Sequence, residues 1–168
     1  MSRSSKKSSE NRTLPPLDLE FMVKAKGVSA VTLSLSTNRT EGIEWKIVGS
    51  CSPLLKGLIA KWMESYIKGV QPQAPLPILL DHLPPYTKRV LTLLRDIPFG
   101  VTLTYKQLAE ITGNPNGARA VGSACSNNPL LLIIPCHRVL AAKGLGGFSS
   151  GLDIKKALLA FEGHKNVK

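Results

Sequence analysis

The chain has 168 residues, of which 43% are hydrophobic and 20% are charged. This length suits one ordinary domain or two small ones with a buried core. The three cysteines, Cys51, Cys125 and Cys136, are an odd and sparse set without CxxC spacing. They argue against a disulfide framework and against a four-ligand structural zinc site, and they fit a reducing compartment.

The net charge is +11, because 22 lysines and arginines stand against 11 acidic residues. A summed positive field attracts polyanions, so the charge favours a nucleic-acid partner, with plainly solvated lysines as the alternative. No apolar run is long enough to span a bilayer. Residues 1–13 are basic and rich in serine but lack the apolar segment of a secretory signal, so we expect a disordered basic tail.

Residues 14–70 are predicted to form a small α/β support domain without a catalytic cluster. Alternating apolar residues predict two strands on either side of Lys26-Gly27, hence a hairpin, and a third strand at 43–48. Ser52-Pro53 then opens a helix. Its apolar residues recur at helical spacing and are expected to face the core: Leu54, Leu55, Leu58, Ile59, Trp62, Met63 and Tyr66.

Residues 71–83 are expected to form a linker, because three prolines between 70 and 78 exclude a helix. A C-terminal domain then covers residues 84–168. It is expected to begin with a helix at about 86–95 and to end with one at about 153–161. That last helix is predicted to bury Ile154, Ala157, Leu158 and Phe161.

A pair of helices between 102 and 129 forms a helix-turn-helix pattern. Thr104 can cap the first, which has apolar positions at Leu108, Ala109 and Ile111, and Asn116 can cap the second, which runs to about 126. The second helix surrounds Arg119 with small residues: Gly117, Ala118, Ala120, Gly122, Ser123 and Ala124. Two explanations stay open, namely close packing on a neighbouring element or close approach to a nucleic-acid groove.

The apolar segment LLLIIPCHRVL, residues 130–140, contains a thiol, an imidazole and a guanidinium in succession. We interpret Cys136 as a nucleophilic thiolate at the end of a buried strand. His137 is the next residue, and neighbouring side chains on a strand point to opposite faces. Activation of the thiol therefore needs a turn at Pro135 or a bridging water. Arg138 is interpreted as an ion-pair or hydrogen-bond anchor of this turn.

Glu162 is the candidate group to orient the imidazole. It stands at the end of the last helix, just before Gly163, where an acid opposes the helix dipole. It is therefore either exposed or paired with a cation.

PCHRV at 135–139, with ARAVG at 118–122, resembles the active-site signature of the O6-alkylguanine-DNA alkyltransferases. IPFGVTLTYKQLA, Asn128-Pro129, GGFSSG and FEG follow the family's order, and the resemblance covers roughly 86–163. We expect a ribonuclease-H-like α/β N-terminal domain, with a small antiparallel sheet plus a helix, before a mostly α C-terminal domain with the helix-turn-helix.

The resemblance implies a single-turnover suicide reaction that transfers an alkyl group from O6 of guanine, and from O4 of thymine, in DNA. Cys136 would accept the alkyl group, His137 would activate it through a water, and Glu162 would orient His137. Tyr105 would donate a proton or hydrogen bond to the leaving base. Asn128 would hold the turn that carries the cysteine. No cofactor is implied.

The resemblance also implies that the helix after 116 enters the minor groove of double-stranded DNA, with Arg119 replacing a flipped nucleotide. The DNA-binding residues would be Arg119, Ala118, Gly122, Ser123 and Tyr105. The pocket for the flipped base would be formed by Val139, Phe148, Ser149 and Ser150. The protein would be a monomer. It would be cytoplasmic and associated with the nucleoid, or nuclear if the host is a eukaryote.

The sequence departs from the family in a few places. Phe148 stands where many members have tyrosine, Ser150 stands at a position of variable size, and Leu91 replaces a frequent tryptophan. The cysteines of an N-terminal zinc site are missing, so we predict no zinc. Three other classes compete: a non-catalytic alkyltransferase-like module that recognises alkylated DNA, a Cys-His hydrolase, and a plain DNA-binding regulator. The first lacks the reactive cysteine that is present here.

Overall fold

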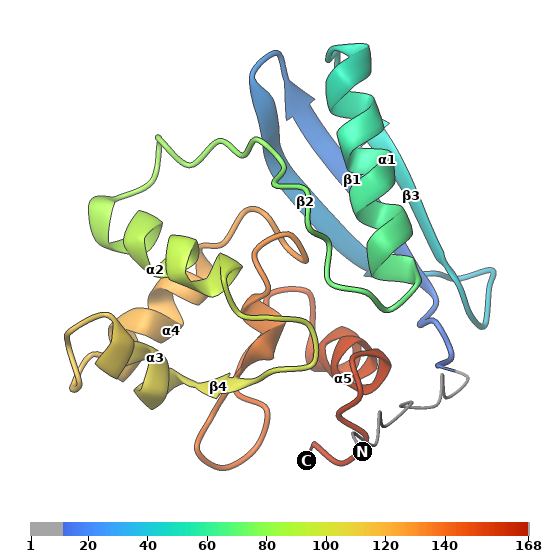
Figure 1. The fold of residues 1–168 in the computed structure, drawn as a ribbon. Coiled ribbons are helices and arrows are strands. Elements are labelled where there is room, and N and C mark those ends of the chain that lie inside the picture. Colours follow the sequence, from blue (N-terminus) through green and yellow to red (C-terminus); the bar gives the residue numbers. More distant parts are fainter. Residues whose placement is uncertain (1–11, 168) are drawn as a thin grey trace, which may run out of the picture.

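The computed structural model describes residues 12–167, so residues 1–11 of the expected basic tail lie outside the described part. A three-stranded sheet opens the fold (Figure 1). Strands β1 (Leu17–Lys24) and β2 (Gly27–Leu35) form the predicted antiparallel hairpin, and β3 (Ile43–Val48) adds to the other edge of β1.

The prediction that this sheet is wholly antiparallel is wrong, because β3 pairs with β1 in parallel. The connection at 36–42 passes the start of β1, where Leu17 N–H donates to the Gly42 carbonyl and Gly42 N–H donates to the Leu14 carbonyl. These bonds carry the chain across the end of the central strand, so β3 begins on the far edge. The sheet is therefore mixed.

Helix α1 (Pro53–Ile67) packs on the sheet, as Figure 1 shows. The predicted start is confirmed, because Ser52 Oγ accepts from Leu55 N–H as an N-cap should. Leu54 is 73% exposed, so its predicted inward orientation is wrong. The residues that α1 buries are Leu55, Ile59, Trp62, Met63 and Tyr66.

The Pro-rich segment lies against the sheet. Val28 N–H donates to the Pro77 carbonyl and Leu79 N–H donates to the Val28 carbonyl, each at 2.9 Å. A Cβ on Gly27 would lie 2.6 Å from the Pro77 oxygen, so only glycine permits this approach. Leu76 and Leu80 are buried in a core cluster that draws on both halves of the chain. The Pro-rich segment therefore packs against the sheet and contributes to the core.

The C-terminal half is mostly helical (Figure 1). Its elements are α2 (Pro85–Arg95), β4 (Leu103–Thr104), α3 (Tyr105–Ile111), α4 (Ala118–Ser126), a single 3₁₀ turn (Cys136–Arg138), β5 (Val139–Leu140) and α5 (Leu152–Phe161). Strands β4 and β5 pair in parallel, and α4 packs against both α2 and α3.

The predicted cap of α3 is confirmed, because Thr104 and Gln107 form a reciprocal capping box. The cap of α4 is one residue later than predicted: Gly117, not Asn116, is the N-cap, and it makes no side-chain capping bond. A Cβ at Gly117 would meet Asn114 at 2.6 Å. Ile111 is 55% exposed, so its predicted burial is wrong.

The predicted strand at 130–134 is wrong, because this segment folds back on itself. Ile133 N–H donates to the Leu131 carbonyl and Ile134 N–H donates to the Leu130 carbonyl, each at 2.9 Å. Leu132 has φ of 71°, the rarer and strained form of a γ-turn, and is the only non-glycine residue among 12–167 with positive φ. The reversal buries every apolar side chain from 130 to 134 while it satisfies these backbone groups.

Candidate active site

Cys136 opens the 3₁₀ turn directly after this reversal. Its N–H donates to the Ile134 carbonyl at 2.8 Å, and Arg138 N–H donates to the Pro135 carbonyl at 2.9 Å. These short-range bonds orient the thiol toward a pocket of about 260 Å³. The pocket is lined by Tyr105, Gly122, Cys125, Ser126, Cys136, Gly147, Phe148 and Ser149.

Asn128 ties this turn together from the end of α4. Its Nδ2 donates to the Ile134 carbonyl at 2.9 Å and to Cys136 Sγ at 3.2 Å, while its Oδ1 accepts from Leu130 N–H at 2.9 Å. One buried side chain therefore holds both ends of the reversed segment and the sulfur itself.

Cys136 is 5% exposed. Burial raises its pKa, while the hydrogen bond from Asn128 and the charge of Lys155 act in the opposite direction. Because the net change in the pKa is upward, the resting group is a thiol and not a thiolate. A nucleophile at this position therefore needs a base.

His137 supplies a buried imidazole in the next position. Its Nε2 lies 2.7 Å from Glu162 Oε1, and this contact assigns the tautomer with hydrogen on Nε2. Nδ1 is buried and has no hydrogen-bond partner among residues 12–167. In this tautomer Nδ1 carries a free lone pair, so the ring is set up to accept a proton.

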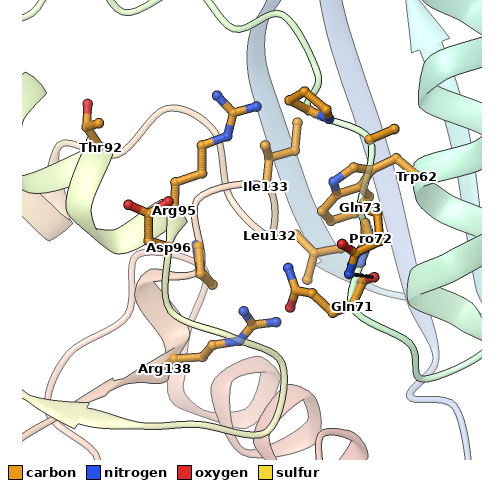
Figure 2. A pocket seen from close by; sticks show the side chains of 13 residues that line it. Trp62, Gln71, Pro72, Gln73, Thr92, Arg95, Asp96, Leu132, Ile133 and Arg138 are labelled. Carbon is orange, nitrogen blue, oxygen red and sulfur yellow. Dashed lines mark hydrogen bonds between the residues drawn. The ribbon is translucent and has the colours of Figure 1, made fainter.

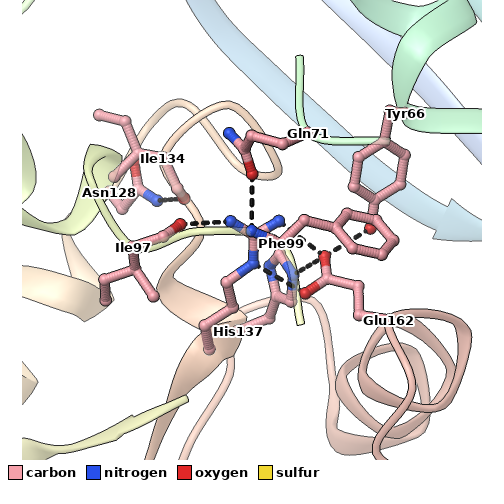
Figure 3. Close-up of polar contacts among 9 residues, drawn as sticks. Tyr66, Gln71, Ile97, Phe99, Asn128, Ile134, His137 and Glu162 are labelled. Carbon is pink, nitrogen blue, oxygen red and sulfur yellow. Dashed lines mark hydrogen bonds and ion pairs between the residues drawn. The ribbon is translucent and has the colours of Figure 1, made fainter. Parts of the chain in front are cut away.

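Glu162 is 2% exposed and lies in a dense polar cluster (Figure 3), so the alternative of an exposed glutamate is wrong. Oε1 accepts from Tyr66 Oη at 2.9 Å and from Arg138 Nη2 at 2.9 Å, and Oε2 accepts from Arg138 Nε at 2.7 Å. Burial alone would raise the pKa of Glu162, but His137 and Arg138 together lower it well below its usual range. The carboxylate therefore stays ionised and holds the imidazole.

Arg138 joins Glu162 to the rest of the domain. Its Nη1 donates to the Ile97 carbonyl at 2.6 Å, and its guanidinium lies 5.7 Å from the centre of the Phe99 ring. With the two bonds to Glu162, these contacts confirm the interpretation of Arg138 as an anchor of the turn.

Three residues of the site went unnoticed in the sequence. Tyr66 was predicted only as core, but its hydroxyl connects α1 to Glu162. Cys125 lies in the pocket wall, where burial and then the charge of Cys136 raise its pKa to about 12. Lys155 is buried on α5. The available signal for Lys155 was its spacing of seven residues, or two helical turns, from Glu162. Ala157, on the same helix, was predicted to face inward but is only partly buried.

The other predicted residues fall into two groups. Tyr105 is half-buried in the pocket wall, where burial and then the charges of Cys125 and Cys136 raise its pKa. Gly122, Phe148 and Ser149 also line the pocket. The five other residues predicted for DNA binding or for the pocket do not: Arg119 and Ser123 are exposed on α4, Ala118 and Ser150 are partly buried, and Val139 is fully buried.

A second pocket, of about 360 Å³, lies between the Pro-rich segment and α2 (Figure 2), next to the 3₁₀ turn Cys136–Arg138, which we call the catalytic turn. Arg95, Asp96, Leu132, Ile133 and Arg138 are among the residues around it. Although it is larger, neither Cys136 nor His137 lines it, so the smaller pocket is the candidate active site.

Among residues 12–167, no group of three or more His, Cys, Asp or Glu side chains could hold a metal ion. The helices of this part of the chain are also too short or too polar to cross a membrane.

The chain is similar to known proteins. The family model described as "6-O-methylguanine DNA methyltransferase, DNA binding domain" matches residues 85–164. A methylated-DNA–protein-cysteine methyltransferase of Homo sapiens is 41% identical over 130 residues, which cover 71% of this chain and 60% of that protein. A protein of the same name from Methanosarcina acetivorans is 51% identical over 79 residues, 46% of this chain and 51% of its own length.

Solved structures resemble the chain over most of its length. Mycobacterium tuberculosis OGT, solved in complex with DNA, has a TM-score of 0.66 and 26% identity, with 86% of this chain and 92% of that chain covered. An O6-methylguanine DNA methyltransferase from Methanococcus jannaschii has a TM-score of 0.55 and 30% identity, with 89% and 90% covered. The family model, the sequence identities and the shared fold agree, and the chain belongs to the O6-methylguanine-DNA methyltransferase family.

Proposed function

We propose that this protein repairs DNA by moving an alkyl group from O6 of guanine to its own Cys136, once per molecule. The observation that carries the proposal is the pocket of about 260 Å³ that Cys136 lines, next to the buried His137–Glu162 pair. O4 of alkylated thymine is the second substrate. The relatives whose names indicate this activity are matched over only 60% and 51% of their lengths, so the activity is inferred from the site as well.

The reaction starts with removal of the thiol proton. His137 Nδ1 accepts it through a bridging water, and Glu162 holds the ring and stabilises the imidazolium. The thiolate sulfur then attacks the alkyl carbon, a carbon–sulfur bond forms, and the carbon–oxygen bond breaks. Its electron pair passes to the guanine, to which Tyr105 Oη donates a hydrogen bond. The product is a thioether, which has no easy hydrolytic exit, so the protein is consumed.

Access to O6 requires that the base leave the duplex. The pocket of about 260 Å³ is the place for the flipped base, and Gly122 brings the backbone of α4 to its rim. Arg119 is exposed on the same helix and fills the gap in the stack, with Ala118 and Ser123 along the minor groove. The net charge of +11 supplies affinity for phosphates without selecting a sequence.

In this proposal α3 and α4 act as a helix-turn-helix, the partner is double-stranded DNA, and the protein works as a monomer. It acts wherever the host keeps its DNA, in the nucleoid or the nucleus. The pocket residues proposed to contact the base are Phe148 and Ser149, while Ser150 and Val139 lie outside the pocket lining.

Mass spectrometry of the protein after incubation with duplex DNA that contains O6-methylguanine tests the proposal. We expect one methyl group per protein molecule, located in the peptide that contains Cys136, and restored guanine in equal amount. Undamaged duplex of the same sequence is the control.

Two outcomes would contradict it. Tight binding of the damaged duplex with an unmodified Cys136 would identify a recognition module. Continued repair after all the protein is consumed would identify a turnover enzyme.

Arg119→Ala should separate base flipping from chemistry. Because Arg119 is exposed and outside the pocket, its loss should slow repair of duplex DNA on the order of tenfold or more, the equivalent of about 1.4 kcal/mol. Reaction with free O6-benzylguanine should stay the same, because no base has to leave a stack. Lys56→Ala, which removes an exposed charge on α1, is the matched control. Equal losses with both substrates would rule out the flipping role.

A further inference from the structure

Lys155 is the one lysine among residues 12–167 whose side chain is buried, at 0% exposed. It lies on α5, seven residues or two helical turns before Glu162, and the chemistry proposed above does not use it. Burial of an ammonium group is unfavourable unless polar partners compensate for the lost water. The position of this side chain therefore calls for a reason.

The ammonium group holds two walls of the reaction pocket together. Nζ donates to the Val139 carbonyl at 2.7 Å and to the Gly147 carbonyl at 3.0 Å. Val139 follows the catalytic turn directly, and Gly147 belongs to the glycine-rich loop that lines the pocket. Nζ also lies 5.9 Å from the centre of the Tyr105 ring, on the third wall. Lys155 thus connects the turn, the loop and α3.

The charge of Lys155 has no carboxylate partner in the described part of the chain. The salt bridges there join other residues, and both contacts of Nζ are neutral carbonyls. The titratable groups that face it are Cys136 from the 3₁₀ turn, Cys125 from α4 and Tyr105 from α3. Of these, only Cys136 has a role that requires a negative charge.

We propose that Lys155 is a positioning residue that serves as the counter-charge of the Cys136 thiolate while its two hydrogen bonds hold the Gly147 loop against the catalytic turn. This inference rests on the proposed function, because it explains how a buried thiol can lose its proton to His137. The charge arises in a place from which water is largely excluded, where a fixed positive group acts strongly.

The electrostatics of the site agree with this geometry. Burial lowers the pKa of Lys155 to about 8, and the charges of Cys136 and Cys125 act to raise it. In return, the charge of Lys155 opposes the effect of burial on the pKa of Cys136. At neutral pH the ammonium form therefore predominates, and ionisation of the thiol strengthens it.

The test measures the thiol without DNA. Cys136 is alkylated with iodoacetamide over a range of pH, and its modification is followed in the Cys136 peptide alone. Lys155→Met and Lys155→Gln remove the charge, and the glutamine keeps one donor for the carbonyls. With either variant, we expect the inflection in alkylation rate to move up by about one pH unit, and alkylation at neutral pH to slow about tenfold.

Two further variants complete the test. Lys155→Arg keeps the charge and should restore an inflection close to that of the wild type. Lys156→Met, which removes the exposed neighbouring charge on α5, should have no effect. Near-ultraviolet circular dichroism verifies that each variant is folded.

An unchanged inflection in a folded neutral variant would overturn the proposal, even if methyl transfer from DNA became slower, because slower transfer alone would indicate only a structural role. An inflection that moves in Lys155→Arg as far as in Lys155→Met would overturn it as well. If the wild type is alkylated by iodoacetamide but takes no methyl group from DNA, the proposed function fails, while the inflection still decides the role of Lys155.

Discussion

Glu162→Gln should lower the free energy of unfolding by about 3–5 kcal/mol, because it leaves the charge of Arg138 buried without its partner. The guanidinium of Arg138 is almost fully buried, and its two bonds to Glu162 are 2.7 and 2.9 Å long. The Tyr66 and His137 contacts weaken with the same change. Urea unfolding followed by circular dichroism measures the loss. Methyl transfer should also slow, because the imidazole loses the group that orients it.

Glu64→Gln is the matched control, because Glu64 pairs with Lys68 on the exposed face of α1 and solvent screens that pair. Its stability should stay close to that of the wild type. A loss for Glu162→Gln no larger than that for Glu64→Gln would contradict a structural role of the buried pair.

The buried Glu162–Arg138 pair also predicts that the stability of the protein decreases in acid. The pKa of Glu162 is lower in the folded protein than its ordinary value, through His137 and Arg138 acting against burial. The contribution of Glu162 to the free energy of unfolding is therefore complete above the ordinary glutamate pKa of about 4.3. It disappears as the pH falls through the lower pKa of the folded protein. The difference in unfolding free energy between the wild type and Glu162→Gln should narrow over that acid range. A constant difference would argue against an ionised Glu162.

Cys136→Ala should abolish methyl transfer, with a rate reduced on the order of 10⁴-fold or more, because no other group in the pocket can act as the acceptor. Cys125 is the one other thiol in the pocket lining, and its pKa of about 12 keeps it protonated. The variant should still bind duplex DNA, since the exposed face of α4 is unchanged. Asn128 keeps its bond to the Ile134 carbonyl, so the turn should persist.

Mass spectrometry and a DNA-binding titration on the same preparation measure both properties. Cys51→Ala, a partly exposed thiol away from the pocket, is the control that should transfer normally. In Cys125→Ala the methyl group should still appear on Cys136. Residual transfer in Cys136→Ala, with the methyl group on Cys125, would show that the acceptor was assigned wrongly.

Local signals in the chain predicted most of the elements. Ser52-Pro53 and Thr104 mark helix starts because their side chains bond the first free N–H groups of the helix, which depends only on residues three positions away. The Lys26-Gly27 hairpin is equally local. Burial was predicted wrongly where the prediction rested on apolar spacing alone. Leu54 and Ile111 are exposed because no partner element covers them.

The thiol, the imidazole and the carboxylate of the candidate site are also predictable from the sequence. The backbone conformation that holds these groups in place is not predictable in the same way. An unbroken apolar run predicts a strand, yet residues 130–134 form a reversed turn, because the bonds of Asn128 to both ends outweigh the local preference for extension. Likewise, the parallel pairing of β3 depends on where the connection crosses β1.

The sequence by itself thus predicted the candidate thiol and imidazole and determined the positions of the helices and the hairpin, because these follow from residue chemistry and from contacts within a few residues. Only the tertiary structure decided which polar groups are buried and with what partners. Tyr66 reaches Glu162 across 96 positions of the chain, and Lys155 is buried against carbonyls of the turn and the loop. The polarity of a buried site depends on the distant segments that enclose it, and residue spacing does not encode those contacts.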